Sequence, residues 1–205
     1  MKYTSYLFDL DGVLVNTDEI QYKTTSDAIL HVLNYNISCD SKIVSVFRST
    51  ITTLEKLHFL SNYLALSEDI IHIIYETKKE LANSYFSKLK VDNEKIELMT
   101  YLKNNQCKIA VVTNSNKKSA QIILKNIGIY EFIDVIITNE DVINKKPDPE
   151  PYLTAIEILG SSKEECAIFE DSEIGLISAR ATGCYFYHVK SYLDVNTKLV
   201  QSLNK

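Results

Sequence analysis

Five short runs of apolar residues constrain the fold of this 205-residue chain more than any other feature. They are rich in isoleucine and valine and show no alternation of polar and apolar residues. Such runs are typical of strands that are buried on both faces, as in a parallel sheet. Helical stretches lie between the last four runs, as in a doubly wound arrangement. The sequence therefore predicts an α/β fold with strands at residues 6–8, 108–112, 135–138, 166–169 and 184–189, and helices at residues 119–127, 151–159 and 173–182.

Residues 16–90 interrupt this rhythm, because they contain no convincing parallel strand. They are instead predicted to form several helices, one of which carries a leucine at every third or fourth position. We expect a small helical domain here, inserted into a core formed by residues 1–15 and 91–205. The alternative, in which these are ordinary core helices of a single domain, stays open at this point. The predicted helices cover residues 18–33, 54–64 and 68–89.

The composition limits the classes of partner. The formal net charge is −5 and the lysines form pairs rather than long basic runs, so no general nucleic-acid surface is expected. No run reaches the roughly 18 apolar residues of a membrane span, and the apolar stretch at the N-terminus is too short for a signal peptide. We therefore expect no membrane association and a cytoplasmic location. The cysteines include no C-x-x-C pair, which argues against a zinc site.

Reactive polar side chains follow four of the predicted strands. In open α/β sheets, sites form beyond the carboxyl ends of the strands, so these groups are expected to converge. Each segment alone could be an ordinary loop, but four together indicate a functional site. The segments are Asp9-Leu10-Asp11-Gly12, Thr113-Asn114-Ser115, Lys145-Lys146-Pro147 and Glu170-Asp171-Ser172.

Asp9 and Asp11 are the first candidates for chemistry. Residues two apart on extended backbone point to the same side, so the two carboxylates can act on one substrate. One can attack as a nucleophile while the other moves a proton. Gly12 permits a tight turn directly after the pair. The alternative is an Asp-Gly turn with a solvated acid, although an apolar strand leads into these acids.

Glu170 and Asp171 would bring two more carboxylates to the same place. Four acids in one pocket repel one another unless a cation lies among them. Mg²⁺ prefers oxygen ligands and is the expected cofactor. The alternative is a helix N-terminus that carries acids because the helix dipole favours them.

Thr113, Asn114 and Lys146 are candidates for binding a phosphate group. Thr113 ends an apolar run, and its hydroxyl and the following amides precede a helix, where anions are bound readily. Lys146 precedes Pro147, which restricts its backbone to an extended form. A lysine held in this way can balance the charges of phosphate and carboxylates. Taken singly, a helix cap at Thr113 and a surface lysine at position 146 would be the simpler interpretations.

Together these segments resemble the four motifs of the haloacid dehalogenase superfamily. Residues 8–17 resemble the first motif, Thr113 the second, residues 146–149 the third, and residues 170–172 with Gly175 the fourth. Order and spacing agree over nearly the whole chain. The segment most resembles the branch that contains β-phosphoglucomutase and phosphoglycolate phosphatase. The resemblance implies a Rossmann-like core with a mobile helical cap inserted after the first motif.

The resemblance also implies a role for each matching residue. Asp9 would form an aspartyl-phosphate, and Asp11 would protonate the leaving group and then activate water. Thr113 and Lys146 would hold the phosphoryl group of a small phosphorylated metabolite, such as a sugar phosphate. Mg²⁺ would be bound by the carboxylates of Asp9 and Asp171, the main-chain carbonyl of Asp11, and Glu170 directly or through water.

Several other activities remain as alternatives. A phosphomutase of the β-phosphoglucomutase type usually carries a histidine and an arginine in its cap, where Gln21 and Thr50 fall in this chain, with Arg48 nearby. A dehalogenase would lack the second acid, Asp11. A receiver module, which accepts a phosphoryl group without being an enzyme, would have adjacent acids and no helical insert. A Mg²⁺-dependent phosphatase is the favoured function.

Overall fold

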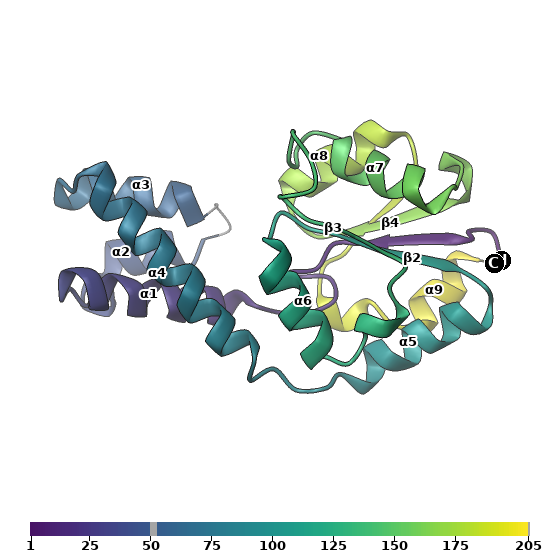
Figure 1. The fold of residues 1–205 in the computed structure, drawn as a ribbon, viewed down its shortest axis with the longest axis horizontal. Helices are drawn as coiled ribbons and strands as arrows, with labels where there is room; N and C mark the ends of the chain where they lie inside the picture. The colour runs from purple at the N-terminus through teal and green to yellow at the C-terminus, as the bar shows by residue number, and fades with distance from the viewer. Residues whose placement is uncertain (50–52, 205) are drawn as a thin grey trace. The chain divides into compact units, whose positions relative to one another are not determined.

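Residues 1–49 and 53–204 are described by the computed structural model (Figure 1). The chain forms two compact units. Unit 1 consists of Met1–Asn16 and Leu89–Lys205, and unit 2 consists of Thr17–Lys88. Unit 2 is thus an insertion that follows the first strand of unit 1 and its turn, and the rest of unit 1 follows the insertion.

Unit 1 is built on a parallel sheet of five strands within the described residues. The strand order is β3-β2-β1-β4-β5, so the first strand in the chain lies at the centre. Every residue of the central strand is buried, as continuous apolar sequence requires. The prediction of a doubly wound α/β fold is confirmed. The strands are β1 (Ser5–Phe8), β2 (Lys108–Val112), β3 (Val135–Ile137), β4 (Cys166–Glu170) and β5 (Tyr185–His188).

The register of the central strands aligns their carboxyl ends. Phe8 pairs with Val111 on one side and with Phe169 on the other. The residues that follow these three strand positions therefore leave the sheet at the same edge. This alignment brings the first, second and fourth polar segments of the sequence together.

Helices cover both faces of the sheet (Figure 1). α7 and α8 pack on one face, in a core cluster that includes Leu7, Val112 and Tyr152. α5, α6 and α9 lie on the other face. No helix was predicted at α5 or α9, although Leu98, Met99 and Leu102 of α5 lie at helical spacing and are buried. The helices are α5 (Asn93–Asn104), α6 (Lys117–Asn126), α7 (Glu150–Leu159), α8 (Glu173–Thr182) and α9 (Thr197–Leu203).

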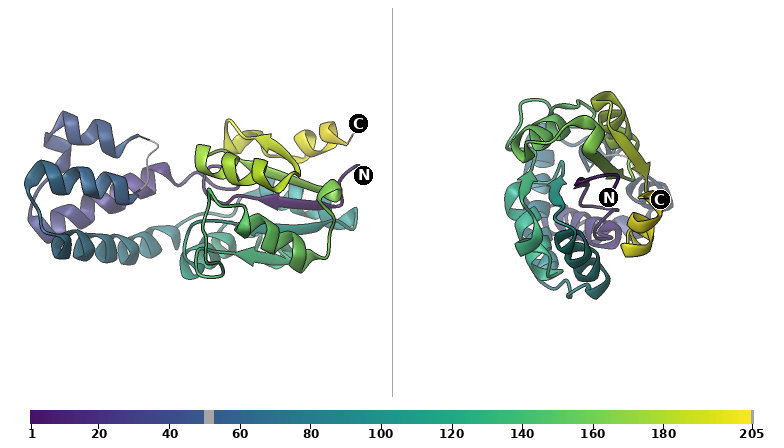
Figure 2. Two further views of the ribbon diagram at one scale, coloured as in Figure 1. Left: turned by 90° about the horizontal axis from the view of Figure 1, so that it is seen from above. Right: turned by 90° about the vertical axis from the view of Figure 1, so that its right-hand side faces the viewer.

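Asn204 links the C-terminal helix to the N-terminal strand of unit 1 (Figure 2). The side chain of Asn204, which follows α9, accepts a hydrogen bond from the backbone N–H of Lys2 at 2.8 Å. The same side chain donates to the hydroxyl of Tyr6 at 2.8 Å. The C-terminal helix is therefore fastened beside the start of the central strand.

Unit 2 is a helical bundle, which confirms the predicted helical insertion. α1 and α4 pack against each other over much of their length. The leucine pattern of α3 holds in part, because Leu57 and Leu60 are fully buried whereas Leu54 is 50% exposed. The sequence did not predict α2, which begins after the capping side chain of Asp40. The helices are α1 (Asp18–Leu33), α2 (Ser41–Phe47), α3 (Thr53–Leu64) and α4 (Glu68–Phe86). None of the helices in the described ranges is long and apolar enough to cross a membrane.

Candidate active site

Asp9 directly follows the central strand. Its backbone N–H donates to the carbonyl oxygen of Phe169 at 2.9 Å, so the β1–β4 ladder extends to this residue. The residue is only 8% exposed. A carboxylate in such a place is held rigidly by the sheet and has little access to solvent.

The chain turns sharply after this carboxylate. The backbone N–H of Gly12 donates to the carbonyl of Val15 at 2.7 Å, and Gly12 has a φ of 83°. A Cβ atom at this position would lie 2.0 Å from Oδ2 of Asp171. Both the left-handed backbone and the lack of space require glycine here. The turn therefore brings the Asp9 loop directly against Asp171.

Lys146 reaches the same place from the loop between β3 and α7. Its ammonium lies 2.6 Å from Oδ1 of Asp9 and 2.7 Å from Oε2 of Glu170. It also donates to the main-chain oxygen of Val112 at 2.8 Å. The predicted lysine and two of the predicted acids are thus in direct contact. The lysine is 5% exposed, so it is a buried cation rather than a surface side chain.

Three of the predicted acids form a compact cluster. Side-chain oxygens of Asp9, Glu170 and Asp171 lie within 4.8 Å of one another. Burial and the neighbouring Glu170 raise the pKa of Asp9 well above its ordinary value, although Lys146 opposes the shift. The same two causes raise the pKa of Asp171 to about 7. Oδ1 of Asp171 is buried and has no hydrogen-bond partner within the described residues. Hard oxygen ligands, crowded negative charge and a buried acceptor without a donor all fit a divalent cation.

Glu170 differs from Asp9 and Asp171 because both of its carboxylate oxygens accept several hydrogen bonds from the protein. Oε2 accepts from the ammonium of Lys146 and from the hydroxyl of Tyr152, both at 2.7 Å. Oε1 accepts from the backbone N–H of Asp171 and from both the backbone N–H and the hydroxyl of Ser172. Burial by itself would raise the pKa of Glu170, but Lys146 and these hydrogen bonds lower it. Asp9 and Asp171 are therefore better suited to direct contact with a metal ion.

Gly175 leaves the space that Glu170 occupies. A Cβ atom on Gly175 would lie 2.0 Å from the carboxylate carbon of Glu170. Ser172 caps α8 by accepting from the backbone N–H of Gly175 at 3.2 Å. The start of α8 is thus shaped around a buried glutamate.

The side chains of Asn114 and Ser115, which follow β2, hydrogen-bond to two other segments of the site. The side chain of Asn114 makes two hydrogen bonds of 3.2 Å with the backbone of Lys146, one through each of its polar atoms. The hydroxyl of Ser115 donates to Oδ2 of Asp11 at 3.0 Å. The buried hydroxyl of Thr113 accepts from the backbone N–H of Ser115 at 3.0 Å. Any contribution of Asn114 to anion binding would therefore come from its main-chain N–H, because its side chain positions Lys146.

Asp11 lies beside the cluster rather than inside it. Its side chain is half-buried and is not among the clustered oxygens. The family resemblance implies that Asp11 contributes a main-chain carbonyl to a metal and uses its side chain for proton transfer. A half-buried carboxylate next to the buried carboxylate of Asp9 is placed well for proton transfer.

Sequence reasoning missed Tyr152, and it named Ser115 and Ser172 only as members of the polar segments, without a catalytic or binding role. Tyr152 lies in the first turn of α7, in a stretch whose apolar pattern predicts only a buried aromatic side chain. Its hydroxyl contact with Glu170 joins residues 18 positions apart and has no local signal. Ser115 and Ser172 stand next to predicted residues, so their short polar side chains were the available clue.

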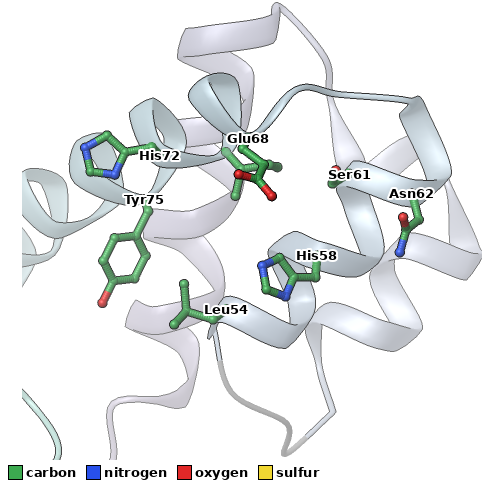
Figure 3. Close-up of a pocket in the computed structure, with 8 residues that line it drawn as sticks. Leu54, His58, Ser61, Asn62, Glu68, His72 and Tyr75 are labelled. Atoms are coloured by element: carbon green, nitrogen blue, oxygen red, sulfur yellow. The ribbon is translucent and has the colours of Figure 1, made fainter.

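Unit 2 contains an open groove of its own between α3 and α4 (Figure 3). None of the predicted catalytic or metal-binding residues lies in it. Glu68 points towards His58 across the groove. The lining residues are Leu54, His58, Ser61, Asn62, Glu68, Ile71, His72 and Tyr75.

Known proteins resemble this chain over most of its length. A protein of Caldanaerobacter subterraneus subsp. tengcongensis, provisionally named pyrophosphatase PpaX, is 30% identical over 93% of this chain and 83% of its own length. A phosphorylated carbohydrates phosphatase of Thermotoga maritima is 28% identical over 86% of this chain and 80% of its own length. The crystal structure of a predicted phosphoglycolate phosphatase from Haemophilus somnus has the same fold, with a TM-score of 0.81 and 17% identity, and the match covers 100% of this chain and 99% of that one.

The sequence also matches the profile of the haloacid dehalogenase-like hydrolases over residues 6–189. This range extends from the central strand through unit 2 to the end of β5, so it includes every residue of the site. The resemblance predicted from the four motifs is thereby confirmed. The chain belongs to the haloacid dehalogenase-like hydrolase family.

Proposed function

We propose that this enzyme is a Mg²⁺-dependent phosphatase that hydrolyses a small phosphomonoester through an aspartyl-phosphate on Asp9. One observation carries the proposal: the buried carboxylate of Asp9 lies 2.6 Å from the ammonium of Lys146 at the end of the central strand. A carboxylate held in this way is a fixed nucleophile beside a positive charge. That charge can stabilise the oxygens of a phosphoryl group as it is transferred.

The first half of the reaction moves the phosphoryl group to the enzyme. A carboxylate oxygen of Asp9 attacks phosphorus, and the bond between phosphorus and the leaving oxygen breaks. Asp11 gives its proton to that oxygen, so the leaving group departs as a neutral alcohol. Lys146 and the main-chain N–H groups that follow Thr113 bind the phosphoryl oxygens.

The second half returns the enzyme to its starting state. A water molecule attacks phosphorus while the ionised Asp11 takes one of its protons. The bond between phosphorus and the Asp9 oxygen breaks, and inorganic phosphate leaves. The same carboxyl group thus serves as acid and then as base, which restores its proton for the next cycle.

The carboxylates of Asp9 and Asp171 and the main-chain carbonyl of Asp11 would hold Mg²⁺, with Glu170 contributing through water. When bound, the ion would neutralise part of the negative charge that the acids and the phosphoryl group bring together. The saturated hydrogen bonding of Glu170 supports an indirect contribution.

The two relatives suggest the substrate class. The Thermotoga protein is named for phosphorylated carbohydrates, which supports a sugar phosphate or a similar small metabolite. The Caldanaerobacter protein is named as a pyrophosphatase, which makes inorganic diphosphate the second candidate. Both substrates present a terminal phosphoryl group to Asp9, and they differ in the leaving group that Asp11 must protonate.

Hydrolysis is favoured over a mutase reaction by the contacts of Arg48 in unit 2. A mutase must hold a second phosphate, preferably with an arginine. The guanidinium of Arg48 lies 2.7 Å from the carboxylate of Glu19 and 4.1 Å from the ring centroid of Tyr22. Arg48 is therefore already paired with a carboxylate, which does not favour its use in binding a second phosphate. Gln21 accepts a hydrogen bond from Lys78. Thr50 lies outside the described residues.

A turnover screen tests this proposal. Purified protein with Mg²⁺ is given a panel of sugar phosphates, other phosphomonoesters and inorganic diphosphate, and the release of inorganic phosphate is measured. We expect release from at least one sugar phosphate that exceeds release from diphosphate. Efficient conversion of β-glucose 1-phosphate to glucose 6-phosphate, with little phosphate released, would establish the mutase instead.

A further inference from the structure

The position of the Lys146 ammonium depends on a balance between two carboxylates. The ammonium has three N–H groups. They meet three acceptors, namely Oδ1 of Asp9, Oε2 of Glu170 and the main-chain oxygen of Val112. The side chain is only 2% exposed, so the ammonium has almost no access to solvent. A stronger interaction with Glu170 would therefore weaken the contact with Asp9.

Tyr152 acts on both members of the Lys146–Glu170 pair. Its hydroxyl donates to Oε2 of Glu170 at 2.7 Å, which is the same oxygen that Lys146 contacts. Its ring lies beside the ammonium, with Nζ of Lys146 4.7 Å from the ring centroid. Cations are attracted to the faces of aromatic rings. The tyrosine thus contacts the lysine with its ring and the partner carboxylate with its hydroxyl.

Packing alone does not explain the hydroxyl group. Tyr152 is fully buried in the cluster between the sheet and α7, where it packs with residues such as Leu7 and Ile168. A phenylalanine would fill almost the same space without burying a polar atom, and burial of a hydroxyl is costly unless it has a partner. Glu170 is that partner. The hydroxyl is therefore placed where it changes the environment of a single carboxylate oxygen.

We propose that Tyr152 is a positioning residue that keeps the ammonium of Lys146 on Asp9. By sharing Oε2 of Glu170, its hydroxyl limits the attraction of that carboxylate for the lysine. This inference rests on the proposed function, in which Lys146 stabilises the charge of Asp9 and of the transferred phosphoryl group. Without the hydroxyl, Lys146 is the remaining side-chain donor to Oε2 among the described residues. The ion pair with Glu170 then tightens and the support of Asp9 weakens.

The test compares Tyr152→Phe with Tyr6→Phe. Tyr6 is also fully buried and also hydrogen-bonds through its hydroxyl, to Asn204, outside the site. We expect Tyr152→Phe to lower kcat about tenfold, as the loss of part of a hydrogen bond to a charged group would do, with KM nearly unchanged. Tyr6→Phe should leave both constants near wild type. A merely structural role would lower the melting temperature of both variants without this selective loss of kcat.

A second measurement does not depend on turnover. Crystal structures of both variants give the distance between Nζ of Lys146 and Oδ1 of Asp9. We expect this distance to increase in Tyr152→Phe and to stay near 2.6 Å in Tyr6→Phe. An unchanged distance, or an unchanged kcat in an active enzyme, would overturn the proposal. If the wild-type protein hydrolyses no phosphate ester, the proposed function fails, and the distance still decides whether Tyr152 positions Lys146.

Discussion

At the scale of single residues, the site combines groups that are unfavourable in isolation. Asp9 is buried beside Glu170, and both effects disfavour its ionised form. Lys146 is buried too, and burial disfavours its charge, but the two adjacent carboxylates raise its pKa overall. Each charge is tolerated because the others are present. Removal of one charge at this site should therefore affect folding as well as chemistry, because it leaves its buried partners uncompensated.

Asp9→Asn should abolish turnover, because an amide oxygen cannot form the acyl phosphate. We expect a loss of more than about a hundredfold in kcat, more than the smallest typical loss for a group that only moves a proton, because the covalent route through Asp9 is closed. The measurement is phosphate release by freshly purified variant. Asp69→Asn, an exposed change in α4, is the matched control and should retain wild-type activity. Activity of Asp9→Asn close to that of the control would show that the nucleophile is misassigned.

Asp11→Asn should slow turnover while leaving the phosphate site intact. Positioned acid–base groups contribute typically about 10²–10⁴-fold to rate, so kcat should fall by that order. The asparagine can still accept the 3.0 Å hydrogen bond from Ser115, so the loop should keep its shape. Binding of a phosphate analogue such as beryllium fluoride, followed by calorimetry, should be nearly unchanged. Loss of analogue binding would indicate a structural role for Asp11 instead.

At the scale of elements, α5 is fastened to the C-terminal segment by a buried lysine. The ammonium of Lys95 donates to the main-chain oxygens of Tyr192 at 2.6 Å and Val195 at 2.8 Å. The residue is 1% exposed, and burial lowers the pKa of its ammonium. The contact joins residues about 100 positions apart.

Lys95→Ala should destabilise the protein without altering its chemistry. It leaves two buried carbonyl oxygens without a donor and opens a cavity, which together cost about 2–4 kcal/mol in the free energy of unfolding. Urea denaturation measures this cost. Lys103→Ala, in the same helix, removes a partly exposed ion pair with Asp134 and should cost less than about 1 kcal/mol. Equal losses in the two variants would contradict the role given to Lys95.

At the scale of the whole molecule, every residue proposed for phosphoryl transfer lies in unit 1. The acid cluster also makes the stability of that unit depend on pH and on a bound metal ion. Burial and Glu170 raise the pKa of Asp171 to about 7, whereas the unfolded chain loses the same proton near the ordinary value of about 3.9. The protonated group therefore contributes its full stability below about pH 4, and this contribution is lost as the pH rises through 7 in the metal-free protein.

Mg²⁺ should reverse that loss. The ion binds ionised carboxylates, so it competes with the proton on Asp171 below about pH 7 and binds freely above it. We expect Mg²⁺ to raise the melting temperature more at about pH 8 than at about pH 5.5, as measured by calorimetry.

Ca²⁺ should restore activity poorly after chelation, because it prefers more ligands and longer bonds. Full activity in excess chelator would refute the metal assignment.

Local sequence patterns predicted the parallel sheet, the helical insertion and the four polar segments. Each is encoded locally: apolar runs mark buried strands, and Asp9, Thr113 and Glu170 stand where such runs end. Parallel strands have their carboxyl ends at one edge, so convergence of these segments follows from the pattern alone. The short turn at Gly12 was also predictable, because it depends on a local feature, the glycine directly after Asp11.

The pairing of the side chains at that edge was not predictable from the sequence, because it depends on the order of the strands in the sheet. Lys146 lies 137 positions from Asp9 and 24 from Glu170, yet contacts both, because β1 lies between β2 and β4 in the sheet. That strand order has no local signature. The side chain of Asn114 is directed to the Lys146 backbone, and the hydroxyl of Tyr152 to Glu170, for the same reason. Hydrogen bonds between distant segments depend on which strands are neighbours in the sheet. The order of the strands is a property of the packed sheet and is not encoded in any one segment.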